Sequence, residues 1–75
     1  MIEEIGAVAG AIWHVLDMNG EMMLAKLKKE VEAEGPLFDW AIGWLAREDK
    51  IELMRDKRTI RVWLKGREAQ RANAA

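Results

Sequence analysis

Apolar residues recur at helical spacing through the first part of the chain. The repeating positions are Ile5, Val8, Ala9, Ile12 and Leu16. Residues spaced in this way lie on one face of an amphipathic helix. Asn19 is followed by Gly20, a turn dipeptide whose glycine can adopt the positive φ that ends many helices. The pattern therefore predicts a helix over residues 2–18.

The middle of the chain predicts a short extended segment and two more helices. Residues 21–24 form the extended segment, which is a candidate strand. A second, short helix is marked by three apolar positions: Leu24, Leu27 and Val31. Gly35 and Pro36 end this helix and start the next, because glycine stops helices and proline suits their first turn. The third helix is expected from Pro36 to Glu48, with a buried stripe of Phe38, Ala41, Ile42 and Leu45.

The apolar period changes from about 3.6 to about 2 after residue 50. Two alternating runs, residues 51–54 and 59–64, flank the charged stretch 55–58, which is the pattern of a β-hairpin. Both apolar sets face the core only if Leu53 pairs with Val62, since a one-residue slip would turn one set into water. The same register predicts the pairs Ile51–Leu64, Glu52–Trp63 and Met54–Arg61.

This register also predicts which residues are buried and how the strands are joined. Glu52 and Trp63 are expected on the outer face of the sheet. Neither Lys57 nor Arg58 is a glycine or asparagine, so a tight two-residue turn is unfavourable and a four-residue loop is expected. The predicted core contains Ile12, Leu16, Leu27, Ile42, Leu45, Leu53 and Val62.

The order helix, short strand, helix, turn, helix and hairpin resembles the winged helix-turn-helix arrangement. Residues 19–30 (NGEMMLAKLKKE) and 41–52 (AIGWLAREDKIE) are similar to a small prokaryotic winged helix-turn-helix family of unknown function. The resemblance covers residues 2–64. It implies an α+β fold, a three-helix bundle with a small antiparallel sheet, in which the third helix is the recognition helix and the hairpin is the wing.

The resemblance carries two further expectations. Family members usually have a small polar cap where this chain has Met23, so the second helix is expected to start less sharply. DNA binding is implied by fold analogy alone, and a fold does not determine a function. We expect one winged helix-turn-helix domain over residues 1–64 and a basic, flexible tail over residues 65–75.

Composition excludes most catalytic chemistry. The 75 residues contain no cysteine, serine or tyrosine, and His14 is the one histidine. Ser–His and Cys–His nucleophilic pairs and cysteine–histidine zinc sites are therefore ruled out. The longest mainly apolar run, residues 5–16, is shorter than the roughly 20 residues of a membrane span. We expect a non-enzymatic, cytoplasmic protein without a cofactor, a bound metal, a small-molecule substrate or a membrane anchor.

Charge divides the chain, although the net charge is −1. Residues 1–49 carry ten acidic and four basic side chains, whereas residues 50–75 carry eight basic and three acidic ones. Such an asymmetry favours a basic surface for a polyanion or an acidic face for a basic partner. The competing interpretation is that the two halves neutralise each other within one small fold.

The strongest functional candidate is the wing. Cations on an exposed hairpin are suited to phosphate contacts, although a solvated tip is commonly charged in any case. Base edges are read mainly by Arg, Lys, Asn, Gln, Ser and Thr, and Arg47 is the only such residue on the predicted third helix. We therefore expect weak, salt-sensitive and largely sequence-nonspecific contacts with duplex DNA, in a module of the transcription-regulator type. The candidate contacts are Arg55, Lys57, Arg58, Arg61 and Lys65, with Lys26 and Lys29 extending the patch.

Leu37, Trp40 and Trp44 give the third helix an apolar flank. One interpretation is that the two indoles pack into the core, as helical aromatic residues commonly do. The other is an interaction surface, because tryptophan is enriched at binding hot spots. The alternative function is thus a protein-interaction or homodimerising winged helix that uses this flank.

Overall fold

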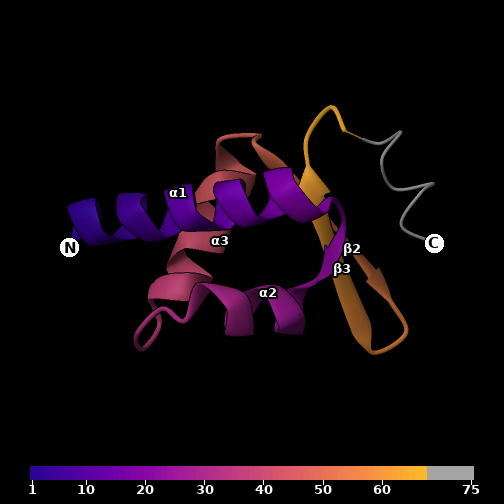
Figure 1. Ribbon diagram of the computed structural model, residues 1–75, viewed down its shortest axis with the longest axis horizontal. Helices are drawn as coiled ribbons and strands as arrows, with labels where there is room; N and C mark the ends of the chain where they lie inside the picture. The colour runs from indigo at the N-terminus through magenta and orange to yellow at the C-terminus, as the bar shows by residue number, and fades with distance from the viewer. Residues whose placement is uncertain (68–75) are drawn as a thin grey trace.

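The computed structural model describes residues 1–67, which form three helices and a three-stranded antiparallel sheet (Figure 1). The sheet order is β1-β3-β2, so the first strand adds to the outer side of the hairpin. This arrangement confirms the predicted α+β fold class. The elements are α1 (Ile2–Asn19), β1 (Met22–Met23), α2 (Leu24–Val31), α3 (Leu37–Arg47), β2 (Ile51–Asp56) and β3 (Thr59–Leu64).

The helices α1 and α2 are each followed by a residue with a positive φ. Gly20 has φ 75° and its N–H donates to the Leu16 carbonyl at 2.8 Å, which closes α1 one residue beyond the prediction. The α2 helix begins after Met23, whose side chain makes no capping hydrogen bond. It ends at Val31 because Glu32 adopts a left-handed φ of 53°. The predicted second helix, which extended to Gly35, was therefore too long.

The hairpin confirms the predicted register and corrects the predicted turn. Leu53 pairs with Val62, and the other predicted pairs are all present. The pairing continues to Asp56 and Thr59, so only two residues join the strands. The expected four-residue loop was wrong because Lys57 adopts a left-handed φ of 57° without being a glycine. For a non-glycine residue this conformation costs about 1–2 kcal/mol.

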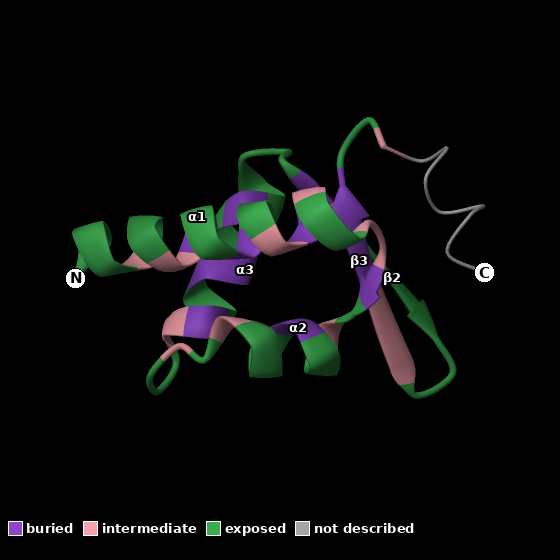
Figure 2. Cartoon of the chain, in the orientation of Figure 1, coloured by how far each residue is buried: buried purple, intermediate pink, exposed green. Residues whose placement is uncertain are grey.

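The core lies where α1, α2 and α3 meet the base of the sheet (Figure 2). Six of the seven predicted core residues are buried: Ile12, Leu16, Leu27, Ile42, Leu45 and Val62. Leu53, the seventh, is 41% exposed, so its prediction as a core residue was wrong. Burial along β2 falls from buried Ile51 to exposed positions from Leu53 onward, because the hairpin extends past the helices that cover its base.

The outer face of the sheet also differs from the expectation. Trp63 lies opposite Glu52, as the register requires, yet it is only 4% exposed. It is not part of the core cluster formed with the helices. Trp63 thus lies opposite Glu52, on the predicted outer face of the sheet, but it is buried there.

The residues that follow β3 contact the body of the domain. The Lys65 N–H donates to the Lys50 carbonyl at 3.0 Å. The Arg67 guanidinium binds the Asp17 carboxylate of α1 at 2.7 Å and lies 6.0 Å from the centre of the Trp13 ring. Residues 65–67 are thus attached to the domain. The predicted flexible tail otherwise falls on residues 68–75, outside the described part of the chain.

Candidate nucleic-acid interface and aromatic surface

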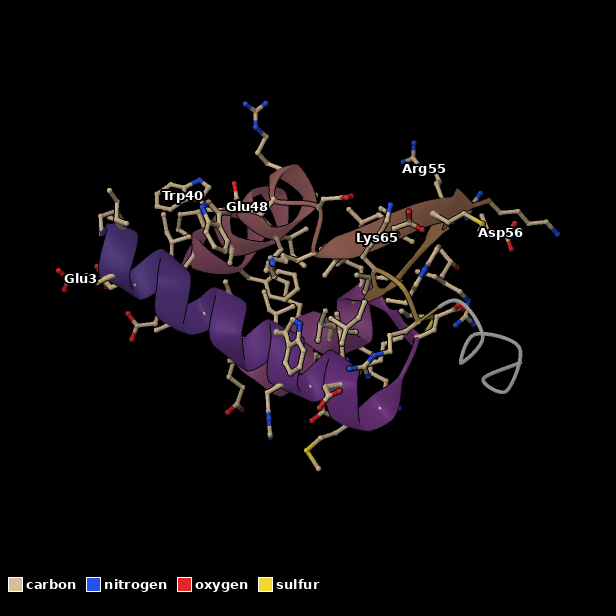
Figure 3. The ribbon with its side chains drawn as sticks, turned by 90° about the horizontal axis from the view of Figure 1, so that it is seen from above. Glu3, Trp40, Glu48, Arg55, Asp56 and Lys65 are labelled. Carbon is tan, nitrogen blue, oxygen red and sulfur yellow. The ribbon has the colours of Figure 1, made fainter. Side chains whose placement is uncertain are left out.

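The wing tip, residues 55–58, carries three exposed cations. Arg55, Lys57 and Arg58 make no ion pair with any side chain in residues 1–67. Figure 3 shows Arg55 and Asp56 at the far end of the hairpin, with Arg55 projecting away from the ribbon. The tip therefore presents its basic groups to solvent beside a single acid.

Arg61 lies on the opposite face of the hairpin from Arg55. Arg55 shares the helix-facing side with Leu53, since alternate residues of a strand share a face. There it lines an apolar groove of about 500 Å³ with Leu24, Ile42, Leu53 and Ile60. Arg61 instead binds the Glu21 carboxylate at 3.1 Å, and the Glu21 side chain is only 8% exposed. The predicted basic patch is thus divided between two faces.

Lys65 is also engaged within the protein. Its Nζ lies 2.9 Å from Glu52 Oε1 and 3.4 Å from Asp49 Oδ1 (Figure 3). The hydrogen bond to Glu52, followed by that to Asp49, raises the pKa of Lys65 above its ordinary value. Its charge is therefore offset by two carboxylates, unlike the charges of the wing tip.

The two candidate lysines of α2 are both exposed. Lys26 lines a groove that also contains Glu21, Glu30 and Arg61, which places it on the β1 side of the sheet. Lys29 is exposed. Neither lysine makes an ion pair with the described residues 1–67. Lys26 therefore lies beside Arg61 and does not line the groove that holds Arg55.

The exposed stripe of α3 is aromatic. Trp40, Gly43, Trp44 and Arg47 follow one another at spacings of three and four residues, and all are exposed. The indoles are 46% and 48% exposed, so the interpretation of Trp40 and Trp44 as core residues was wrong. Leu37, predicted on the same flank, is half-buried. We call Trp40, Gly43, Trp44 and Arg47 the α3 stripe.

Neither metal-binding nor membrane-spanning features occur in the described residues. No group of three or more His, Asp or Glu side chains within residues 1–67 is placed to hold a metal ion. In the same part of the chain, no helix has both the length and the hydrophobicity needed to cross a bilayer.

Three helices followed by a hairpin with an exposed basic tip define a winged helix-turn-helix domain. The chain belongs to the family described as winged helix-turn-helix domain (DUF2582), which matches residues 1–64. This finding confirms the resemblance that the sequence predicted.

Two similar proteins support the same assignment. An uncharacterized protein of Methanocaldococcus jannaschii is 42% identical over an alignment of 65 residues, and the match covers 83% of this chain and 91% of that protein. The solution NMR structure of a protein from Bacteroides thetaiotaomicron superposes with a TM-score of 0.74 at 30% identity, covering 88% of this chain and 80% of that one. The fold is thus shared across most of the chain.

The sequence analysis did not predict which cations of the hairpin form ion pairs. The Lys65–Glu52 pair follows from the predicted register, since the two residues are diagonal neighbours across the strands. The Arg61–Glu21 pair requires the pairing of β1 with β3, which periodicity did not specify. A two-residue strand gives too little pattern for such a prediction.

Proposed function

We propose that this protein is a non-enzymatic DNA-binding module of the transcription-regulator type that contacts duplex DNA through its wing tip. The observation that carries the proposal is the difference in pairing among the cations of the hairpin. Arg61 and Lys65 are held by carboxylates, whereas Arg55, Lys57 and Arg58 have no ion-pair partner in residues 1–67. An unpaired cation can bind a phosphate without giving up an existing ion pair, and it releases counterions from the DNA.

The proposed contacts carry little sequence information. Phosphate contacts position a protein on DNA, while side chains in the grooves read the bases. The α3 stripe offers two indoles, one glycine and one arginine for such reading, and Asp39 stands in the first turn of the helix. Lys28 offsets this acid only loosely, at 3.9 Å. In this proposal the protein therefore binds many DNA sequences with similar affinity. It works in the cytoplasm, where the DNA of a prokaryotic cell lies.

The experiment is a titration of a random-sequence duplex by fluorescence anisotropy over a series of salt concentrations. Each phosphate contact contributes about −0.9 to the slope of log affinity against log salt. The double variant Lys57→Ala/Arg58→Ala should flatten this slope by about two units and weaken all sequences alike. The charge-matched control is Arg47→Ala/Lys50→Ala, which removes two exposed cations at and beyond the end of α3. It should change the slope by less than about one unit.

Three results would overturn the proposal. The wing tip would have no role if the Lys57→Ala/Arg58→Ala variant bound as tightly as the parent protein. Absence of binding at the lowest salt concentration would remove DNA as a ligand altogether. A larger loss in the Arg47→Ala/Lys50→Ala variant would instead assign the contact to α3.

A further inference from the structure

An apolar surface continues from α3 onto the amino-terminal part of α1. Trp44 lines a groove of about 280 Å³ with Ile2, Ile5 and Gly6. Ile2 is 85% exposed. Figure 3 shows Trp40 and Glu3 at one end of the molecule, while Arg55 and Asp56 lie at the other. This surface is therefore separate from the wing tip.

Three exposed glycines lie on the helices that carry this surface: Gly6 and Gly10 of α1 and Gly43 of α3. Within residues 1–67, a Cβ atom added at any of them would have no neighbour within 4 Å. Glycine within a helix lowers its stability relative to alanine. No packing contact within residues 1–67 explains the absence of side chains at these three positions. A glycine on an exposed helix face does allow another backbone to approach closely.

Charges of both signs border this apolar surface of α1 and α3. Arg47 lies one helical turn beyond Trp44, and Glu3 lies one turn before Gly6. Neither side chain makes an ion pair with any of residues 1–67. In a two-fold symmetric contact, each base can meet the acid of the other copy and each acid can meet the other base. The charges at the edge of this surface are thus complementary to those of a second copy related by a two-fold axis.

We infer that a second copy of this chain docks on this surface, with the α3 stripes of the two copies crossing at Gly43. The two pairs of indoles and the Trp44 grooves are then covered across a two-fold axis, and Arg47 of each copy lies against Glu3 of the other. A patch of this kind, left open, would expose two indoles and Ile2 to water, which soluble proteins normally avoid.

A second copy fits the surface better than a nucleic acid does. Phosphates favour a cluster of cations, whereas among residues 1–67 this surface offers the unpaired Arg47 beside the acids Glu3 and Glu48. A strongly charged protein partner would likewise meet both attraction and repulsion at this mixed border. The inference is independent of the proposed DNA contact, because the wing tip stays exposed in such a dimer.

Sedimentation velocity over a range of protein concentrations tests the inference. The parent chain should shift from an 8.6 kDa monomer to a species of twice that mass as concentration rises. Gly43→Leu places a side chain at the crossing point and should raise the dimer dissociation constant at least about tenfold. It should leave the fold intact, since Gly43 is exposed and a Cβ added there has no neighbour within 4 Å in residues 1–67. Thermal unfolding of the variant checks this point directly.

The control is Ala11→Leu, which introduces the same side chain at an exposed position on the other flank of α1. It should dimerise like the parent chain. The inference fails if the parent chain stays monomeric up to millimolar concentration. It also fails if Gly43→Leu and Ala11→Leu dimerise equally well.

Charge reversal tests the two-fold arrangement itself. Arg47→Glu and Glu3→Arg should each weaken self-association, because each places like charges against one another in both halves of a symmetric dimer. A mixture of the two variants restores opposite charges at both contacts, so it should form a heterodimer more readily than either variant forms a homodimer. If the mixture associates no better than the separate variants, Arg47 and Glu3 do not meet and the proposed arrangement is wrong. Neither substitution touches the wing tip, so DNA binding can be measured separately on the same samples.

Discussion

The tip and the base of the β2–β3 hairpin carry the same kinds of residue but use them differently. At the base, Leu64 packs into the core, Lys65 binds Glu52, and Arg67 binds Asp17 of α1. Toward the tip, Leu53 is largely exposed, and Arg55 and Lys57 have no ion-pair partner in the described residues. The difference lies in where the helices end, because they cover only the base (Figure 2).

This difference separates side chains that stabilise the fold from side chains that remain available to a ligand. A cation at the base already has an acid within reach, so its removal should change stability. Removal of a cation at the tip should instead weaken binding and leave the free energy of unfolding almost unaltered. Substitutions at matched positions of the hairpin can test this division.

The largest expected effect is loss of core packing at the base. Leu64→Ala should lower the free energy of unfolding by about 2–4 kcal/mol, because Leu64 is 4% exposed and its removal leaves a cavity. Leu53→Ala, the same change on the same face, should cost only about 1 kcal/mol or less, since Leu53 is 41% exposed. Urea denaturation followed by circular dichroism measures both. Equal losses would mean that the helices support the hairpin as far as Leu53.

The second-largest effect on the free energy of unfolding is expected from the loss of Arg67 at the base of the hairpin. Arg67→Ala should lower the free energy of unfolding by about 1 kcal/mol, because it removes the 2.7 Å pair with Asp17 and the contact with Trp13. Arg58→Ala at the tip should change it by less than about 0.5 kcal/mol, as is usual for an unpaired surface residue. The two variants lose the same charge and can be compared in one denaturation series. A larger cost for Arg58→Ala would contradict the division between base and tip.

The turn allows stability and binding to be changed in opposite directions. Lys57→Gly should raise the free energy of unfolding by about 0.5–1 kcal/mol, because glycine adopts the observed φ of 57° without steric cost. The same change removes one unpaired cation, so the salt slope of DNA binding should flatten by about one unit. Lys57→Ala, which keeps the strain, should flatten the slope equally without stabilising the hairpin. If both variants destabilise alike, strain at this residue is not a significant term.

Much of the fold could be predicted because it follows from periodicity. The pairing of Leu53 with Val62 was predictable because only one register keeps both apolar sets on one face. The burial of Leu53 was not, since a strand pattern does not reveal how far the covering helices extend. The two-residue turn was also missed, because residue preference argued against it and the strand pairing outweighed the local strain at Lys57.

The candidate site could be predicted only as a group of residue types. The sequence identified Arg55, Arg61 and Lys65 as basic residues of the hairpin, but it could not distinguish free cations from paired ones. That distinction depends on contacts such as Arg61 with Glu21, which are remote in sequence. The exposure of Trp40 and Trp44 was likewise undecided, since a helical stripe beside the core can face either a neighbouring element or solvent.

The smallest effect is the pH dependence of the lysine at the base. The carboxylates of Glu52 and, second, Asp49 raise the pKa of Lys65 above its ordinary value of 10.5. Because the folded state favours the ammonium form, this stabilising contribution is fully present below the ordinary pKa. It is lost as pH rises through the higher pKa of the folded protein. Glu52→Gln should lower the pKa of Lys65 toward its ordinary value, and Asp49→Asn should lower it less, because the hydrogen bond to Glu52 is the larger cause. An NMR titration of the Lys65 side chain measures these values, and an unchanged pKa in Glu52→Gln would show that the ammonium group is not held at the base in solution.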